Sequence, residues 1–466
     1  MAIMLYDSYS RTLKKVGKNV KLYVCGITPY DHAHIGHART YVLFDVLKRF
    51  LIFSGMNVFH IQNVTDVDDK ILKKAKETGQ EPIKMAHAFN DEAMELFDKL
   101  NILRADVYPK ATEHIGDMIK IIKALVEKGI AYETKTGVYF SVSKFNNYGK
   151  LSSQSMEEIK KHRIEPDETK KHEADFALWK KTDERPCWHS EFGNGRPGWH
   201  IECSAMALKY AKGTLTIHGG GRDLIFPHHE NEIAQSEALT GKQFAKIWVH
   251  TGPLTINGQK MSKSLGNYIT IKDALSKYSP NVMRLFFITS SINSPIDFDE
   301  KNMKLAEANM RNIEEAYKSI ETIINAIKQD ETTMKKYKEV ARIRKEIINI
   351  RREFIKSLED NLNTPTALSH FYAFLKLINA NINYIDRTTA EICMLFFREF
   401  SFITGIKFDK LYNKEREKKL VDMIINLRSV LRQKGFYELS DEIRKKLKDI
   451  DIEIYDEGNE TKIRYL

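Results

Sequence analysis

The sequence predicts an α/β protein built on a parallel sheet and followed by a mostly helical region. In the first part, short apolar runs at Lys21–Cys25 and Asn57–Ile61 flank an apolar helical segment at Ala38–Phe53. A strand, a helix and a strand in this order form a βαβ unit, whose two strands lie parallel. In the last part, beyond residue 300, only three of the chain's 23 glycines occur. The two parts are therefore expected to differ in secondary structure.

The remaining elements follow the same two patterns. Gly55 lies at the end of the first helix, where a residue without a Cβ atom commonly stops helical growth. Two further apolar runs, Thr214–His218 and Lys246–His250, are expected to add strands to the sheet. Beyond residue 300, apolar residues such as Ile343 and Ile347 recur at helical spacing. The helices are expected at Lys301–Lys328, Lys336–Leu358, Thr366–Ile385 and Glu415–Leu431.

Composition and charge narrow the class of protein. Hydrophobic residues make up 42% of the 466 residues and charged residues 29%, which is typical of a globular chain and excludes a disordered one. No apolar run reaches the ~18 residues that a membrane span requires, and no signal peptide is evident, so we expect a cytoplasmic protein that does not contact membranes. The net charge of +10 favours a polyanionic partner. The four cysteines are too few for a disulfide framework.

The first candidate site is the segment His34-Ile35-Gly36-His37, between the first strand and the first helix. Free backbone N–H groups at a helix N-terminus attract phosphate, and a glycine lets a flat base approach the backbone. Considered alone, the four residues would favour a histidine-containing loop with a helix start.

The second candidate site is the segment Lys260-Met261-Ser262-Lys263-Ser264, which glycines bracket on both sides. Its lysines and hydroxyls suit a mobile loop that closes over a triphosphate. Alone, it could be a solvated basic loop. In this order and combination, however, the two segments resemble the HIGH and KMSKS motifs of class I aminoacyl-tRNA synthetases.

A third group of residues suggests a metal site. His228 and Glu232 are four residues apart and would share one face of a helix that starts after Pro227. With Cys25 and Cys203 they offer two thiolates, an imidazole and a carboxylate, which is a plausible zinc shell. Spacing alone leaves open that the cysteines are ordinary buried residues.

Longer stretches resemble the cysteinyl-tRNA synthetases over nearly the whole chain. They are 22–28, 63–70, 109–115, 175–180 and 360–365, with the segments 195–203, 218–223 and 226–232 around the candidate metal residues. The resemblance implies a Rossmann-like class I catalytic domain with a connective insertion, an all-α helical bundle and a small C-terminal anticodon-binding region. The expected boundaries are 1–115 and 206–300 for the two catalytic halves, 116–205 for the insertion and the return to the catalytic core, 301–410 for the bundle and 411–466 for the C-terminal region.

The resemblance also implies an activity. Cysteine would be activated by ATP to an adenylate, with release of pyrophosphate, and then transferred to the terminal adenosine of tRNA(Cys). In this family the zinc ligands fall on Cys25, Cys203, His228 and Glu232, and the zinc ion takes the thiolate of the substrate. A thiol ionises on zinc far more readily than the hydroxyl of serine, so selection by bond type could replace an editing site.

Roles for single residues come from the same resemblance. The expected catalytic residues are His34, Gly36, His37, Lys260 and Lys263. The expected ATP-binding residues are His34, Ile35, His37, Ser262 and Lys263. Mg²⁺ is expected with the nucleotide. The cysteine pocket is expected to include Gly26, Thr65, Trp199 and His218, with Asp66 nearby. The remaining cysteines match no ligand: Cys187 is expected to pack or to bind metal adventitiously, and Cys393 to lie in the core.

The helical part is expected to hold the tRNA, and the protein is expected to be a monomer. Basic clusters at 342–345, 351–352 and 444–446 could meet backbone phosphates, or could be solvated helix faces. The chain's end departs from the family because it lacks a tryptophan there, which leaves Arg464 as a candidate contact. Two other functions compete with this interpretation: transfer of activated cysteine to a small amine, and RNA binding by a zinc protein without catalysis.

Overall fold

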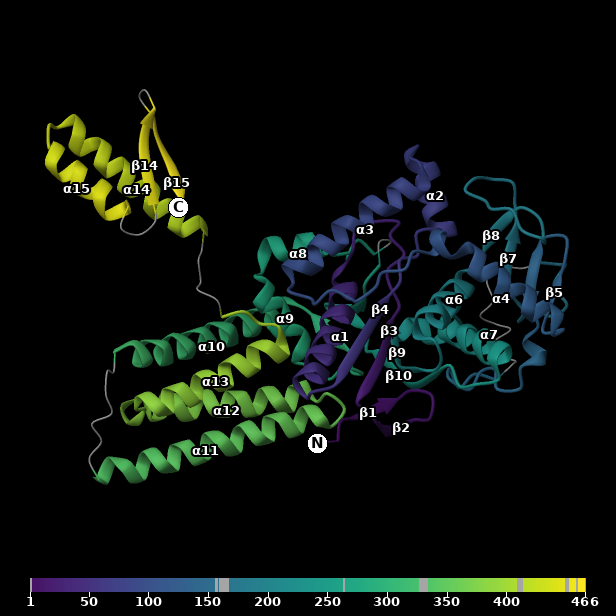
Figure 1. Ribbon diagram of the computed structural model, residues 1–466, viewed down its shortest axis with the longest axis horizontal. Coiled ribbons are helices and arrows are strands. Elements are labelled where there is room, and N and C mark those ends of the chain that lie inside the picture. The colour runs from purple at the N-terminus through teal and green to yellow at the C-terminus, as the bar shows by residue number, and fades with distance from the viewer. Residues whose placement is uncertain are drawn as a thin grey trace. The chain divides into compact units, whose positions relative to one another are not determined.

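The computed structural model describes residues 2–155, 158, 167–262, 265–326, 334–408, 414–448, 452–457 and 460–465. The chain forms two compact units, residues 1–406 and 407–466, drawn from purple to yellow in Figure 1. None of the helices that the structure describes has the length and apolarity needed to cross a membrane.

A four-stranded parallel sheet forms the centre of the first unit. Its strands are β3 (Asn19–Val24), β4 (Asn57–Gln62), β9 (Leu215–Gly221) and β10 (Ala245–Thr251). They lie in the order β10-β9-β3-β4, and every neighbouring pair is parallel. All four strands were expected from the sequence, and the prediction of a parallel sheet is confirmed.

Helix α1 (Ile35–Phe53) connects β3 to β4 and is almost entirely buried. It begins three residues earlier than the apolar pattern predicted, because the His34 side chain accepts hydrogen bonds from the backbone N–H groups of Gly36 and His37 and so caps the helix. The helix packs closely on the sheet: a Cβ atom at Gly219 of β9 would lie 2.2 Å from Phe44. The absence of a side chain at position 219 therefore allows α1 to pack close to the sheet.

A second, antiparallel sheet lies between the halves of the parallel one in sequence. It consists of β5 (Ala131–Glu133), β6 (Gly137–Phe140), β7 (Phe176–Lys181) and β8 (Gly195–Pro197). Apolar residues of these strands share a core with α4 (Ile115–Glu127) and α6 (Trp199–Ala211). The strand pattern here was too short and irregular to be expected from the sequence. Its importance is that β8 leads directly into α6.

The loop with Lys260 belongs to a third sheet, made of β11 (Leu254–Ile256), β12 (Gln259–Lys260) and β13 (Ile296–Phe298). Strands β11 and β12 form a hairpin whose turn is Asn257-Gly258, and both turn residues have positive φ, 48° and 76°. Asn-Gly is the residue pair that such a two-residue turn favours. The short helices α8 (Ile271–Lys277) and α9 (Pro280–Ile288) follow.

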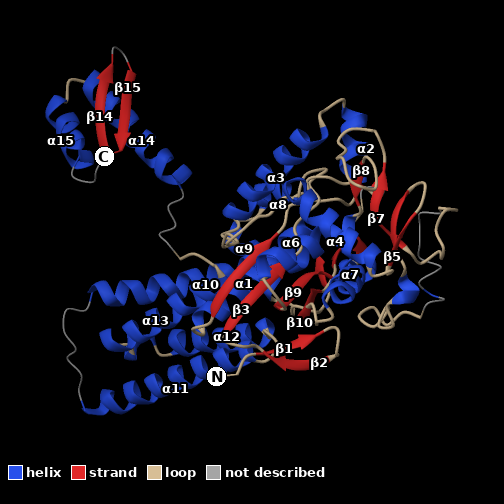
Figure 2. Cartoon of the chain, turned by 45° about the vertical axis from the view of Figure 1, so that its right-hand side comes forward, coloured by secondary structure: helices blue, strands red, loops and turns tan. Residues whose placement is uncertain are grey.

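A helical bundle completes the first unit (Figure 2). Its helices are α10 (Glu300–Ala326), α11 (Met334–Glu359), α12 (Thr364–Ala380) and α13 (Arg387–Thr404). The first three confirm the sequence prediction, apart from their end points; Lys328, where the first was expected to end, lies outside the described residues. Fully buried Arg284 on α9 ties the bundle to α1: it pairs with Asp45 and donates to the carbonyl oxygen of Thr404 at 2.7 Å.

The second unit contains α14 (Lys414–Gln433), α15 (Tyr437–Lys448) and an antiparallel hairpin of β14 (Ile452–Glu457) and β15 (Glu460–Tyr465). Its own small core includes Val421, Leu447, Ile452 and Ile454. Helix α14 was expected, whereas the hairpin was not, because the sequence analysis treated the last part as mostly helical. The five-part division proposed from the sequence stays a prediction.

Candidate functional site

Three segments far apart in sequence supply the side chains of the candidate metal centre. Cys25 follows β3 at the carboxyl end of the parallel sheet, where ligands of such sheets bind. Cys203 lies on α6. His228 lies in a π-helical turn, η4 (Ile225–His229), and Glu232 in the first turn of α7 (Glu230–Thr240). The π-helical turn differs from the regular helix that was expected. The side chains of His228 and Glu232 are nevertheless in contact.

The structure brings together all four residues that the sequence analysis named as metal ligands. One ligand atom from each of Cys25, Cys203, His228 and Glu232 lies within 4.8 Å of the others, and all four residues are buried. His228 Nε2 is 3.0 Å and Cys25 Sγ 3.8 Å from Glu232 Oε1. This donor set matches the thiolate, imidazole and carboxylate chemistry of zinc. The residues thus fit a metal ion.

A second set of donors overlaps the first. Cys25, His218, His229 and Glu232 also bring ligand atoms within 4.8 Å of one another. His218 Nε2 lies 2.8 Å from Glu232 Oε2, and His229 Nε2 lies 3.3 Å from Cys25 Sγ. The sequence analysis did not name His229; the repeated histidine of Pro227-His228-His229 was the available signal.

Further contacts orient the donors. The Nδ1 atoms of His228 and His200 are 3.0 Å apart, and the Trp199 ring lies 4.3 Å from that of His228. His218 Nδ1 is 3.2 Å from the carbonyl oxygen of Tyr23. Histidines that bind metals typically have their second ring nitrogen held in this way.

Burial and close contacts shift the pKa values of the four candidate ligands in different directions. Burial would raise the pKa of Glu232, but His218 and His228 lower it to about 2. Burial would lower the pKa of His228, but Glu232 and Cys203 raise it to about 10. Burial would also raise the pKa of Cys203, whereas contacts with Cys25 and His228 lower it to about 6. The Cys203 thiolate and the Glu232 carboxylate, which are forms that bind cations, are thus favoured. Burial instead raises the pKa of Cys25 well above its usual value, and His228 must lose its proton before it can bind a metal ion.

The first motif forms a compact structure at the start of α1. The rings of His34 and His37 stack with centroids 3.6 Å apart. His34 Nδ1 accepts from the backbone N–H of Gly36 at 3.1 Å and of His37 at 3.3 Å. Burial and the neighbouring His34 lower the pKa of His37 well below its usual range, so that its ring is neutral.

The second motif lies against the first. A Cβ atom at Gly36 would be 3.5 Å from Met261 Cε, and the backbone N–H of Ile35 donates to the carbonyl oxygen of Ile269 at 3.1 Å. Lys260 is exposed, and Asn267 holds its carbonyl oxygen at 3.1 Å and the backbone N–H of Ser262 at 2.8 Å. Lys263 and Ser264 lie outside the described residues.

Asn63 links two residues of the expected cysteine pocket, Gly26 and Thr65. The sequence analysis did not single out Asn63. Asn63 Oδ1 accepts from the backbone N–H of Gly26 at 2.8 Å, and its Nδ2 donates to Thr65 Oγ1 at 3.1 Å. A Cβ atom at Gly26 would lie only 1.6 Å from the Asn63 carbonyl oxygen. The position therefore requires glycine. The neighbouring Asp66 instead binds Thr112 and His87.

The two other cysteines lie outside both donor sets. Cys393 is fully buried on α13, in the core as expected. Cys187 is half-buried and reduced. Whether Cys187 packs or binds a metal ion adventitiously stays a prediction.

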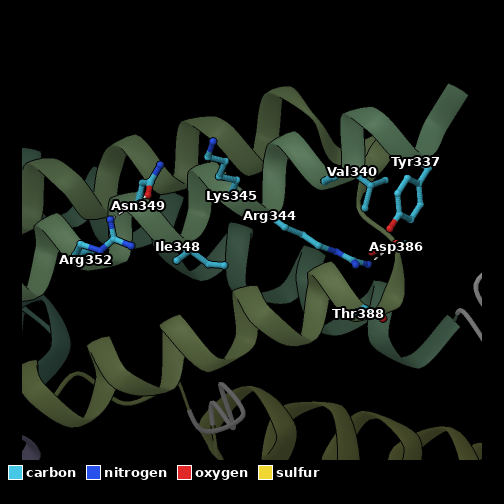
Figure 3. A pocket seen from close by; sticks show the side chains of 10 residues that line it. Tyr337, Val340, Arg344, Lys345, Ile348, Asn349, Arg352, Asp386 and Thr388 are labelled. Atoms are coloured by element: carbon cyan, nitrogen blue, oxygen red, sulfur yellow. Dashed lines mark hydrogen bonds and ion pairs between the residues drawn. The ribbon is translucent and has the colours of Figure 1, made fainter.

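A hollow of about 680 Å³ lies on the bundle, away from these residues (Figure 3). Helix α11 lines it with Arg344, Lys345 and Arg352. The basic clusters expected there are largely neutralised: Arg344 pairs with Asp386, and Arg351 with Glu399. Arg342 pairs with two glutamates of its own helix. Among the described carboxylates, none forms an ion pair with Lys345 or Arg352.

Comparisons with known families cover most of the chain. The tRNA synthetases class I (C) catalytic domain family matches residues 12–308, and the DALR domain family matches residues 353–409. A cysteine–tRNA ligase of Pyrococcus abyssi is 45% identical, over 99% of this chain and 98% of its own length. A cysteine–tRNA ligase of Thermococcus kodakarensis is also 45% identical, over 98% of both chains.

Solved structures show the same fold at low identity. A methionyl-tRNA synthetase of Mycobacterium tuberculosis superposes with a TM-score of 0.63 at 14% identity, covering 84% of this chain and 92% of that one. The LeuRS of Agrobacterium radiobacter superposes with a TM-score of 0.64 at 11% identity, covering 85% of each chain.

Proposed function

The chain belongs to the cysteine–tRNA ligase family of class I tRNA synthetases, and from this premise we propose how its residues charge tRNA(Cys) with L-cysteine. Cysteine reacts with ATP to give cysteinyl-adenylate and pyrophosphate, and the cysteinyl group then passes to the terminal adenosine of the tRNA. The observation that supports this best is the four-donor cluster of Cys25, Cys203, His228 and Glu232 at the carboxyl end of the parallel sheet.

In the first step, the two motifs position ATP. The backbone N–H groups at the start of α1 and the His34 and His37 rings bind phosphate oxygens, with the adenosine over Gly36 and Ile35. Met261 lies beside Gly36, which supports a loop that closes over the nucleotide. Lys260, Ser262 and Lys263 then stabilise the pyrophosphate as negative charge develops on it, with Mg²⁺ bound to the nucleotide. No protein nucleophile is required.

In the same step, the amino acid is selected by the metal cluster, which is the group of four donors Cys25, Cys203, His228 and Glu232. We assign Zn²⁺ to it because two thiols, an imidazole and a carboxylate converge there. When bound, Zn²⁺ supplies a Lewis acid that holds the substrate sulfur as thiolate and discriminates against serine. Gly26 and Thr65, joined through Asn63, form the wall of the pocket, and Trp199 and His218 border it. The residues orient the substrate so that its carboxylate faces ATP.

For the second step, we assign tRNA contacts to cations that form no ion pair with the described carboxylates. Lys345 and Arg352 are exposed in the hollow on α11 (Figure 3). Cations of this kind gain affinity for the RNA backbone through counterion release. Arg444 and Lys445 are exposed on α15, whereas the Arg464 side chain lies outside the described residues. The enzyme is proposed to act as a monomer in the cytoplasm, where tRNA, ATP and cysteine meet.

The test is ATP-dependent charging of bulk tRNA with labelled cysteine, beside labelled serine and a pyrophosphate-exchange assay. Charging with cysteine and not with serine is expected. Cysteine-dependent exchange without charging would indicate transfer to a small amine instead. No activity in either assay, from folded protein with metal bound, would contradict catalysis and leave RNA binding as the function.

A further inference from the structure

Tyr23 lies beside the metal cluster with a hydroxyl group that has no hydrogen-bond partner among the described residues. The residue is fully buried, and its hydroxyl oxygen is inaccessible to water. A buried hydroxyl without a partner is costly, because it loses its bonds to water and gains none in return. Its position beside the cluster suggests an acceptor that becomes available when the site is in use.

The strand geometry directs this side chain toward the cluster. Tyr23 and Cys25 are two residues apart at the end of β3, and side chains at that spacing lie on the same face of a sheet. Across the sheet, Tyr23 is paired in register with His218 of β9, and the two rings meet edge to face at 4.9 Å. Cys203 of α6 belongs to the same buried cluster as Tyr23 and Cys25.

The phenol is placed to donate to Cys203. A tyrosine hydroxyl carries its proton at neutral pH and can donate one hydrogen bond. Among the side chains beside the phenol, Cys203 is the one that lies close enough to accept from the hydroxyl. A neutral O–H group beside a sulfur that becomes a thiolate is stabilised by donating to it.

We propose that Tyr23 is a positioning residue whose hydroxyl donates a hydrogen bond to the Cys203 thiolate when that sulfur binds a metal ion. This inference rests on the metal site of the proposed function and adds to it a residue that is not a ligand. The hydrogen bond withdraws electron density from the sulfur, so that Cys203 donates less to the metal. A site with two protein thiolates then remains able to accept a third sulfur, that of the substrate.

Tyr23→Phe isolates the hydroxyl, because it keeps the ring that packs against His218. The chain offers a matched control in Tyr372 on α12, whose buried hydroxyl also has no partner among the described residues. Tyr372→Phe removes the same atom from the interior of a different part of the fold. An effect of Tyr23→Phe that Tyr372→Phe does not reproduce therefore belongs to the metal cluster.

The experiment uses full-length protein stripped of metal and reloaded with Co²⁺, whose thiolate charge-transfer band reports the electron density on sulfur. For Tyr23→Phe we expect this band at longer wavelength, because the Cys203 sulfur regains the electron density that the hydrogen bond withdrew. The KM for cysteine should rise while the KM for ATP stays unchanged. A wild-type band position in Tyr23→Phe would overturn the proposal.

Two further outcomes are distinguishable. If wild-type protein binds Co²⁺ without a thiolate band, the metal site fails, and this inference fails with it. If wild type shows the band and Tyr23→Phe does not change it, only the role of Tyr23 is overturned. Should Tyr23→Phe not fold, 3-fluorotyrosine at position 23 gives a stronger donor, which should move the band to shorter wavelength; an unmoved band would contradict the proposal.

Discussion

The interior of the metal cluster and the interior of the helical bundle are both buried, but they are built in opposite ways. Around the cluster, buried histidines and carboxylates satisfy one another, as in the contacts of Glu232 with His218 and His228. In the bundle, phenylalanine rings fill the core, and those of Phe371 and Phe400 stack 3.7 Å apart. The first interior depends on particular atom pairs, the second on volume and apolar area. A substitution should therefore affect chemistry in one and stability in the other.

The largest effect is expected from Cys203→Ser. A hydroxyl is a poor ligand where a thiolate is required, so cysteine-dependent pyrophosphate exchange and metal binding should fall by more than about a hundredfold, beyond the loss of a supporting contact. Metal content and exchange are measured together. Cys187→Ser, outside both donor sets, is the matched control. A Cys203→Ser protein with full metal content and near-normal exchange would remove Cys203 from the ligands.

The opposite region gives the next effect. Phe371→Ala deletes a fully buried ring and should lower the free energy of unfolding by about 3–5 kcal/mol. Denaturant unfolding measures this loss. At a temperature where the variant is folded, its KM values for ATP and cysteine should match wild type. A changed KM for cysteine in Phe371→Ala would show that the bundle core and the site are coupled, contrary to the contrast drawn above.

Removal of the second unit sharpens the contrast between chemistry and tRNA binding. A chain that ends after residue 406 keeps the contact of Arg284 with Thr404, which a cut near residue 300 would destroy. We expect cysteine-dependent exchange to stay near the wild-type rate. The KM for tRNA in charging should rise at least tenfold, equivalent to about 1.4 kcal/mol of binding. Equal losses in exchange and charging by a folded truncation would contradict this division.

The smallest effect is expected on the surface of α11. Replacing Lys345 and Arg352 by glutamine should weaken tRNA binding only a few-fold, because each removes one phosphate contact, and should reduce the salt dependence by about one unit per cation. Binding is measured across a salt series. Arg342→Gln is the control, since Arg342 is already paired within its helix. An unchanged salt dependence in the double variant would place the tRNA elsewhere.

The same contrast explains what the sequence could predict. Parallel strands and long helices were predictable because their apolar patterns are local, and the metal donors were identified because they resemble a family motif by motif. The roles of Asn63 and Tyr23 could not be read from a pattern. Asn63 matters through two hydrogen bonds that only the folded chain creates, and Tyr23 through a bond it lacks. Likewise, the sequence shows Arg344 and Arg351 only as members of basic clusters, because their acidic partners, Asp386 and Glu399, lie far along the chain.

The distance along the chain between the cluster's parts also has a consequence for synthesis. Cys25 and His229, whose side chains touch, are 204 residues apart. At a translation rate of roughly 5–20 residues per second, the Cys25 thiol leaves the ribosome about 10–40 s before its partners exist. During that interval strand β3 has neither β9 nor α6 to cover it. The emerging chain therefore exposes a reactive thiol and an unpaired strand edge, so its yield should depend on chaperones and on a reducing environment more than its finished stability suggests.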